Sequence, residues 1–220
     1  NNLIKGIAMV NKVAWITGAG SGIGEASAIK LASEGFSVVL SGRTKETLDM
    51  VASKCEGQVS VKPLDVSNYE DVKVVFEDII SDYGRVDVLV ASAGLNAKNR
   101  NWHNVSEKDF DQIIKIDLNG VFYTNRLVLE KMKEQREGLI INVSSWAGKY
   151  VTTLTGPAYT AAKHGVNALT EGINMEAGHF GVRACALCPG EVATPILDKR
   201  PIPVSKEDKE KMVQPEDCAE

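Results

Sequence analysis

The chain has 220 residues, 44% of them hydrophobic and 25% charged, a composition typical of a globular protein and not of a disordered or fibrous one. A net charge of −4 without a basic patch predicts no nucleic-acid partner, because neutralising phosphates requires clustered Lys and Arg. The apolar runs are far shorter than the roughly 20 residues that cross a bilayer, so we expect no membrane partner. Residues 1–8 lack a signal-peptide pattern, and we expect an extension outside the domain and a cytoplasmic location.

Short runs rich in Val and Ile alternate with amphipathic segments along most of the chain. The predicted strands are residues 12–17, 37–40, 59–64, 86–91, 139–143 and 182–187. The predicted helices are residues 23–34, 45–55, 68–83, 107–135 and 158–180. This alternation indicates one doubly wound α/β domain over residues 9–197, with a parallel sheet of six to seven strands and helices on both faces.

Residues 198–220 differ from the rest of the chain because they combine several prolines with many charges and few large apolar side chains. We expect them to form a mobile segment on the substrate side. Residues 214–220 resemble the start of a further helix, since Pro215 stands at an early position and acids fill the first turn.

A glycine-rich loop, TGAGSGIG from Thr17 to Gly24, follows the first predicted strand and opens the first predicted helix. Missing side chains allow a tight turn, close approach to a pyrophosphate and close packing of the helix on the strand. The helix N-terminus adds free N–H groups and the positive end of a dipole. The loop therefore predicts a nucleotide-binding site, although a flavin, methyl-donor or nucleotide-sugar protein could share it.

Further motifs follow the TGxxxGxG loop in a fixed order. They are ASAG at residues 91–94, Ser144-Ser145 after the fifth predicted strand, YxxxK at Tyr159 and Lys163, and PGxxxT at Pro189, Gly190 and Thr194. On these motifs the chain resembles the short-chain dehydrogenase/reductase family from about residue 12 to residue 194. The resemblance implies a Rossmann-like fold and an NAD(P)-dependent oxidoreductase that acts on CH–OH and C=O groups.

Tyr159 and Lys163 lie four residues apart and therefore share one helix face. A nearby ammonium favours the phenolate, which makes Tyr159 a candidate general acid/base. An isolated YxxxK is more often a half-buried tyrosine with a solvated lysine, and the other motifs favour the catalytic interpretation. Ser145 follows a predicted strand at its carboxyl end, where its hydroxyl can donate to a substrate carbonyl. The resemblance selects Ser145 over Ser144, which should point to the other side.

Asp117 departs from the family pattern, which has an active-site Asn in an NxxG motif where this chain reads DLNG. Asn119 cannot take its place, because two residues along a helix correspond to a rotation of about 200°. The resemblance implies that the backbone carbonyl at this position holds a water in a proton relay, and Asp117 keeps that carbonyl. A carboxylate near Lys163 should also favour the protonated lysine. The alternative is an acid on a helix face without a catalytic part.

The choice of cofactor depends on Ser41-Gly42-Arg43 at the end of the second predicted strand, where no acid is present to bind the ribose 2′-hydroxyl of NAD. Arg43 offers a donor fork for a 2′-phosphate, so NADP(H) is preferred. If Arg43 instead stacks on the adenine, NAD(H) is possible. Asp65, followed by Val66, resembles the family acid at the adenine amino group, with capping of the next helix as the alternative.

The resemblance also implies that Lys163 holds the nicotinamide ribose and that Thr194, with the backbone after Pro189, fixes the carboxamide. The complete predicted cofactor site comprises Gly18, Gly20, Ser21, Gly22, Ile23, Gly24, Arg43, Asp65, Val66, Ala93, Gly94, Tyr159, Lys163, Pro189, Gly190, Val192 and Thr194.

The cysteines and histidines indicate neither a redox site nor a metal site. Cys185 and Cys188 have CxxC spacing, but they lie in a predicted buried strand where they face opposite sides, which favours a core role. Cys55 and Cys218 have no partner visible in the sequence, and a disulfide is not expected. The three histidines show no metal-ligand spacing, so we predict no metal.

These patterns predict an NADP-preferring oxidoreductase, with Tyr159, Lys163, Ser145 and Asp117 as catalytic residues. Its substrate would be a small to medium hydrophobic ketone or alcohol, and the apolar candidates to contact it are Trp102, Trp146, Tyr150 and Leu154. We expect a homo-oligomer, either a dimer or a tetramer. The alternative is a non-catalytic redox sensor or a truncated inactive fragment, since the last strand and final helix of the family are expected to be missing. A Rossmann-like methyltransferase fits YxxxK and PGxxxT poorly.

Overall fold

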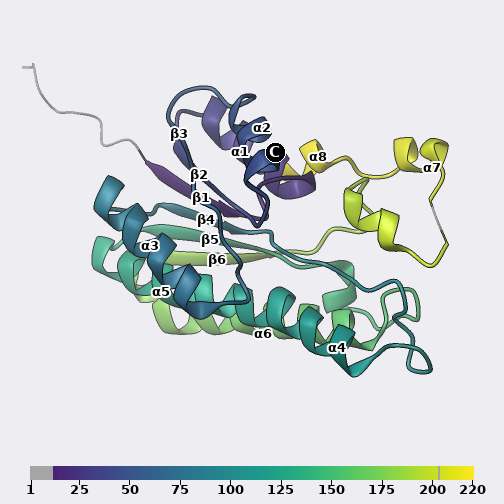
Figure 1. Cartoon of the computed structure of the whole chain (residues 1–220). Coiled ribbons are helices and arrows are strands. Elements are labelled where there is room, and N and C mark those ends of the chain that lie inside the picture. The colour runs from purple at the N-terminus through teal and green to yellow at the C-terminus, as the bar shows by residue number, and fades with distance from the viewer. Residues whose placement is uncertain (1–11, 203) are drawn as a thin grey trace, which may run out of the picture.

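Six parallel strands form one sheet in the order β3-β2-β1-β4-β5-β6, in a computed structural model that describes residues 12–202 and 204–220. The strands are β1 (Val13–Thr17), β2 (Ser37–Ser41), β3 (Val59–Val61), β4 (Val88–Ala91), β5 (Gly138–Val143) and β6 (Val182–Leu187). Helices cover both faces of this sheet (Figure 1). The predicted doubly wound α/β fold is confirmed, whereas the predicted extension at residues 1–8 lies outside the described residues.

The central strand β1 is buried along its whole length, as a strand covered on both faces should be. Its side chains alternate between the two halves of the core, with Val13 and Trp15 on one side and Ala14 and Ile16 on the other. The fully buried indole of Trp15 donates to Ser41 Oγ at 3.0 Å. The side chains of β1 therefore contribute to the core on both faces of the sheet.

The edge strand β3 is shorter than the predicted strand at residues 59–64. The regular strand ends at Val61, two residues before Pro63, whose missing N–H would face the open edge of the sheet and not β2. The chain nevertheless stays beside β2, because the N–H of Lys62 donates to Leu40 O and that of Leu64 donates to Gly42 O. The segment thereby reaches the carboxyl edge of the sheet, where Asp65 follows.

The helices form two layers (Figure 1). One layer contains α1 (Gly22–Ser33), α2 (Lys45–Ala52) and α8 (Pro215–Ala219), and the other contains α3 (Tyr69–Tyr83), α5 (Gly120–Gln135) and α6 (Pro157–Ala177), with α4 (Glu107–Ile114) preceding α5. The α-helices at the predicted ranges 45–55 and 158–180 end at Ala52 and Ala177, and a 3₁₀ turn over Gly178–Phe180 follows α6. No helix in residues 12–202 and 204–220 is both long and apolar enough to cross a membrane.

The long helix predicted at residues 107–135 is interrupted by a π-helical turn over Lys115–Asn119, between α4 and α5. A π turn inserts an additional residue into the helical repeat, and such insertions often occur at functional sites. Asp117 lies in this turn and is fully buried. The uniform helix predicted from the apolar spacing is therefore wrong at this point.

The segment after β6 contains two short helices in the described residues, α7 (Lys206–Lys211) and α8, which follow a 3₁₀ turn at Pro195–Lys199. The predicted helix start at residues 214–220 corresponds to α8, which has a capping box between Gln214 and Asp217. α8 packs against α1 (Figure 1). The mobility expected for residues 198–220 stays a prediction.

Candidate active site

A cavity of about 470 Å³ opens at the carboxyl edge of the sheet, beside the point where the strand order reverses between β1 and β4. Its wall is formed by the loops that follow all six strands, by part of the π-helical turn over Lys115–Asn119 and by part of α6. Every predicted catalytic and cofactor residue except Gly24 lines this cavity. The topology thus brings together residues that are separated by more than a hundred positions in the sequence.

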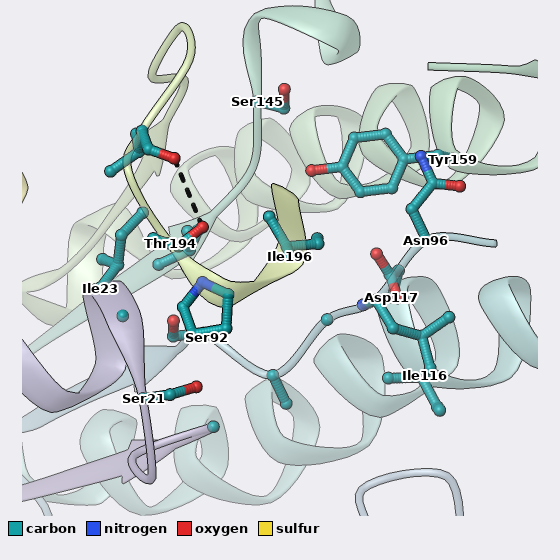
Figure 2. A pocket seen from close by; sticks show the side chains of 18 of the residues that line it. Ser21, Ile23, Ser92, Asn96, Ile116, Asp117, Ser145, Tyr159, Thr194 and Ile196 are labelled. Carbon is teal, nitrogen blue, oxygen red and sulfur yellow. Dashed lines mark hydrogen bonds between the residues drawn. The ribbon is translucent and has the colours of Figure 1, made fainter. Parts of the chain in front are cut away.

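Two glycines of the loop after β1 are required by close contacts. Gly18 has a φ of +64°, and a Cβ at this position would lie 2.7 Å from Ala93 N. A Cβ at Gly24 would lie 2.3 Å from Gly18 O, so Gly24 serves the packing of α1 on the loop. This explains why Gly24 does not line the cavity. Ser21 and Ile23, at the N-terminus of α1, line the cavity (Figure 2), and the N–H groups of the first turn of a helix have no partner within the helix.

The loops after β2 and β3 form one end of the cavity, with Gly42, Arg43, Asp65 and Val66 among the lining residues. Asp65 Oδ1 accepts hydrogen bonds from Ser67 N at 3.0 Å and from Ser67 Oγ at 2.8 Å. Asp65 does not cap α3, because Asn68 is the N-cap and accepts from Glu70 N. The capping alternative for Asp65 is therefore wrong.

Tyr159 and Lys163 project from α6 into the other half of the cavity. Figure 2 shows the hydroxyl of Tyr159 pointing into the cavity. Lys163 Nζ lies 5.3 Å from the centroid of the Tyr159 ring and donates to Val143 O at 2.9 Å. The side chain of Lys163 is only 5% exposed, so water screens the interaction between its ammonium and the Tyr159 ring weakly.

Ser145 lies two residues after the end of β5 and is buried at the cavity wall. Its Oγ accepts a hydrogen bond from Ala147 N at 3.2 Å, so its own hydrogen can be donated to a bound molecule. Ser144 Oγ instead donates to Lys163 O at 3.3 Å. Both serines line the cavity, but their hydroxyls have different partners.

Asp117 connects Lys163 to the loop after β4. Its Oδ1 accepts from Leu95 N at 2.9 Å, and its Oδ2 lies 3.7 Å from Lys163 Nζ. Asp117 is 0% exposed, so it is not an acid on a solvated helix face. Asn119 does not line the cavity, in agreement with the expected difference in direction.

Several residues that sequence reasoning missed line the part of the cavity around Tyr159, here called the far end. They are Asn96, Arg100, Thr155, Glu191, Ile196, Leu197 and Arg200. Asn96 Nδ2 donates to Thr155 O at 3.0 Å, and Arg200 Nη2 lies 2.6 Å from Glu191 Oε1. These residues come from irregular segments in which no motif or periodicity marks them, and only the fold brings them together.

The predicted apolar contacts are correct in part. Trp146 and Leu154 line the cavity, but Trp102 and Tyr150 do not, and these two side chains are 85% and 63% exposed. Polar and charged side chains, among them Asn96 and Arg100, line the cavity beside these apolar ones. The expected hydrophobic substrate stays a prediction.

The four cysteines are free thiols, and Cys185 is exposed. The predicted core role of Cys185 is wrong because Cys185 lies on the face of β6 opposite the face that packs against α6 and the core, and it is exposed there. Burial raises the pKa values of the Cys55 and Cys218 thiols above their ordinary value. No group of three or more potential metal ligands occurs in residues 12–202 and 204–220.

Comparison with known proteins shows the family of the chain. The family model for short chain dehydrogenases matches residues 12–202. A 3-oxoacyl-[acyl-carrier-protein] reductase of Thermotoga maritima is 37% identical over 193 residues, which are 86% of this chain and 78% of that protein. The structure of a 3-ketoacyl-(acyl-carrier-protein) reductase from Brucella melitensis, complexed with NADH, is similar with 32% identity and a TM-score of 0.86, covering 94% of this chain and 87% of that one.

An alcohol dehydrogenase from the archaeon Thermococcus sibiricus, complexed with 5-hydroxy-NADP, is also similar in structure, with 32% identity, a TM-score of 0.84 and the same two coverages. The family match, the relatives and the arrangement of the cavity agree with one another. The chain therefore belongs to the short-chain dehydrogenase/reductase family and is an NAD(P)-dependent oxidoreductase.

Proposed function

We propose that this protein is an NADP-preferring oxidoreductase that interconverts a carbonyl compound and an alcohol. The observation that carries the proposal is one cavity that contains both the N-terminal end of α1 and the side chains of Tyr159, Lys163 and Ser145. A phosphate-binding helix end and an acid/base group in one enclosure are what a nicotinamide-dependent reaction needs.

The residues present fit a nicotinamide dinucleotide. The missing side chain at Gly18 lets the backbone approach a pyrophosphate, and the N-terminus of α1 supplies N–H donors. Asp65 and Val66 would hold the adenine, while Thr194 and the backbone after Pro189 would hold the carboxamide. When bound, the nicotinamide exchanges a hydride with the substrate carbon.

The side chains of the protein would handle the proton and the orientation of the substrate. In the reduction direction the carbonyl carbon gains the hydride and the carbonyl oxygen gains a proton from Tyr159, giving one alcohol. Ser145 donates a hydrogen bond to the same oxygen. Lys163, whose Nζ lies 5.3 Å from the centroid of the Tyr159 ring, would contact the nicotinamide ribose, while Asp117 would hold the lysine ammonium in place.

The preference for NADP rests on Arg43, which lines the cavity just after β2 where an acid would select NAD. A charge-assisted hydrogen bond from Arg43 to a 2′-phosphate contributes about 1.5–3 kcal/mol, or roughly a 10- to 150-fold difference in Kd. The structural relatives were solved with nucleotides of both kinds, NADH in one and 5-hydroxy-NADP in the other. The charge at Arg43 favours the phosphorylated one here.

Nucleotide fluorescence titration tests the cofactor assignment. NADPH should bind at least about tenfold more tightly than NADH, and Arg43→Ala should remove most of this difference. Arg126, exposed on α5 outside the cavity, provides the control variant Arg126→Ala. Equal affinities for NADPH and NADH in the unmodified protein would contradict the NADP preference.

Turnover of a ketone panel tests the catalytic assignment. Tyr159→Phe should lower kcat about 10²- to 10⁴-fold, because the proton donor is lost, and should leave nucleotide binding measurable. A protein that binds NADPH and reduces no carbonyl compound would support the alternative, a redox sensor.

We also propose a homo-oligomer, a dimer or a tetramer, in the cytoplasm. Phe110 of α4 and Phe122 of α5 are 37% and 41% exposed, as aromatic side chains at a subunit interface would be in one isolated chain. The free cysteines suit a reducing compartment. Light scattering of the purified chain gives the oligomeric state directly, and a monomer at high concentration would contradict the proposal.

A further inference from the structure

The far end of the cavity contains two arginines that no motif predicts, Arg100 and Arg200. Arg100 lies in the long loop between β4 and α4, and Arg200 lies directly after the 3₁₀ turn that follows Thr194. Both side chains line the same cavity as Tyr159. Two cations at the substrate end of an oxidoreductase cavity need an explanation in terms of ligand or fold.

Arg100 is held next to the catalytic tyrosine by the backbone around it. Its carbonyl oxygen abuts Gly156, where a Cβ would lie only 2.1 Å from that oxygen, and Gly156 is the N-cap of the helix that carries Tyr159 in its first turn. Its Nε donates to Ala97 O at 2.7 Å, and its Nη1 donates to Leu154 O at 3.5 Å. The guanidinium is therefore fixed in place, and Arg100 as a whole residue is only 6% exposed.

The electrostatics at this end favour a negatively charged ligand. Burial, and then the positive charge of Arg200, lower the pKa of Arg100, while a charged Tyr159 acts in the opposite direction. These three groups are thus close enough to affect one another. Two guanidinium groups that repel each other in a poorly solvated wall are stabilised when an anion joins them.

The neighbouring charges leave room for such an anion. Lys163 is paired with the buried Asp117, and its charge is therefore used within the catalytic group. Glu191 orients Arg200 from the rim, where the carboxylate is 41% exposed and the arginine 17% exposed, so water screens this pair. A ligand oxyanion inside the cavity would meet Arg100 in a drier environment than Glu191 offers.

We infer that the substrate is a carbonyl or alcohol compound that carries an oxyanion, a carboxylate or a phosphate, which Arg100 and Arg200 bind while the reacting carbon faces Tyr159. Guanidinium groups recognise both anions through paired N–H donors. The apolar side chains of Leu154, Ile196 and Leu197 would contact the carbon chain between the anion and the carbonyl. This inference rests on the proposed function and defines its substrate class.

Matched pairs of ketones test the inference, using NADPH oxidation as the readout. The pairs are 4-oxopentanoate with its methyl ester, 3-oxobutanoate with its methyl ester, and hydroxyacetone phosphate with hydroxyacetone. The anionic member of at least one pair should have a kcat/KM at least about tenfold above that of its neutral partner, as a charge-assisted hydrogen bond predicts. The acid pairs and the phosphate pair separately show which anion is preferred.

Three variants locate the effect. Arg100→Met and Arg200→Met should each lower the anion-to-neutral ratio of kcat/KM several-fold, whereas the exposed control Arg126→Met should keep it. Arg100 also donates hydrogen bonds to two loop carbonyls. Arg100→Lys therefore serves as a second variant, because it keeps the positive charge and a hydrogen-bond donor for the loop. Nucleotide titration of each variant reports whether its cavity is intact.

The outcomes separate this inference from the proposed function. Neutral ketones reduced as well as their anionic partners would overturn the anion site and leave the oxidoreductase assignment standing. If Arg100→Met lowers kcat/KM equally for the anionic and the neutral ketone of a pair, Arg100 acts on the fold alone. This result also overturns the inference. If no ketone is reduced, calorimetric binding of 4-oxopentanoate and of its methyl ester to the NADP⁺-saturated protein still decides the anion preference, while the missing turnover counts against the proposed function.

Discussion

The buried pair of Asp117 and Lys163 can be tested by replacing Asp117 with the residue that the family carries. Asp117→Asn keeps an oxygen that can accept from Leu95 N, and it removes the charge that lies 3.7 Å from Lys163 Nζ. With an effective dielectric constant of about 20, two unit charges at this distance attract by roughly 4 kcal/mol. The variant thus removes one interaction and leaves the geometry of the helix in place.

We expect Asp117→Asn to lower the free energy of unfolding by about 3 kcal/mol, at the lower end of the roughly 3–5 kcal/mol typical when one partner of a buried pair is removed. Val143 O still accepts from Lys163 Nζ, which limits the loss. Urea unfolding followed by circular dichroism should show a midpoint about 1 M lower. Asp111→Asn, an exposed position in α4, is the matched control and should change the midpoint little.

A double-mutant cycle with Lys163→Met decides whether the loss comes from this pair. If the attraction is responsible, Asp117→Asn should cost much less when Lys163 is already methionine, giving a coupling of about 2–3 kcal/mol. A coupling near zero, or an Asp117→Asn variant as stable as Asp111→Asn, would refute the electrostatic reasoning. The same variants can be assayed for turnover, because a looser Lys163 should lower kcat more than nucleotide affinity.

Two further predictions concern the glycine loop and the thiols. Gly18→Ala should destabilise the protein by at least about 2 kcal/mol in thermal unfolding and weaken nucleotide binding, because φ is +64° and the added Cβ meets Ala93 N. The control Gly172→Ala, at an open position in α6, should instead stabilise the protein by about 0.5–1 kcal/mol. Equal effects at both positions would contradict the contact. Cys185 should react with a thiol reagent at about pH 8 before Cys55 and Cys218, because burial raises the pKa of these two and lowers their thiolate fraction; Cys185→Ser should remove the fast phase.

The sequence could predict the sheet and the half of the cavity that binds nucleotide because those residues stand in regular positions. Strands buried on both faces give unbroken apolar runs, and the loops at their carboxyl ends converge at one edge of the sheet. Glycines at 18 and 24 are needed for close backbone contacts, which leave a clear pattern of residue type. Tyr159 and Lys163 follow from helical spacing.

The errors have physical causes that local patterns do not carry. The π turn around Asp117 adds one residue to a helical repeat. The apolar spacing of residues 107–135 fits a continuous α-helix as well as a helix interrupted by a π turn, so the spacing could not reveal the turn. The burial of a strand depends on its place in the sheet, so Cys185 could not be recognised as exposed from the composition of β6. Exposed aromatics such as Trp102 have the same composition signal as aromatics that line a cavity.

Arg100 and Arg200 show why the substrate end is the hardest part of this site to predict. The nucleotide end is built from backbone groups at strand ends. Such close backbone contacts require particular residue types, and these appear in the sequence as recognisable motifs. The substrate end is built from side chains on two irregular segments, and each arginine by itself looks like an ordinary surface residue. Only their convergence on Tyr159, with one of them buried, gives them a chemical meaning. The substrate preference of this family member should therefore depend on the two segments that carry Arg100 and Arg200. Substitution of either arginine should alter substrate specificity more than it alters the chemical step.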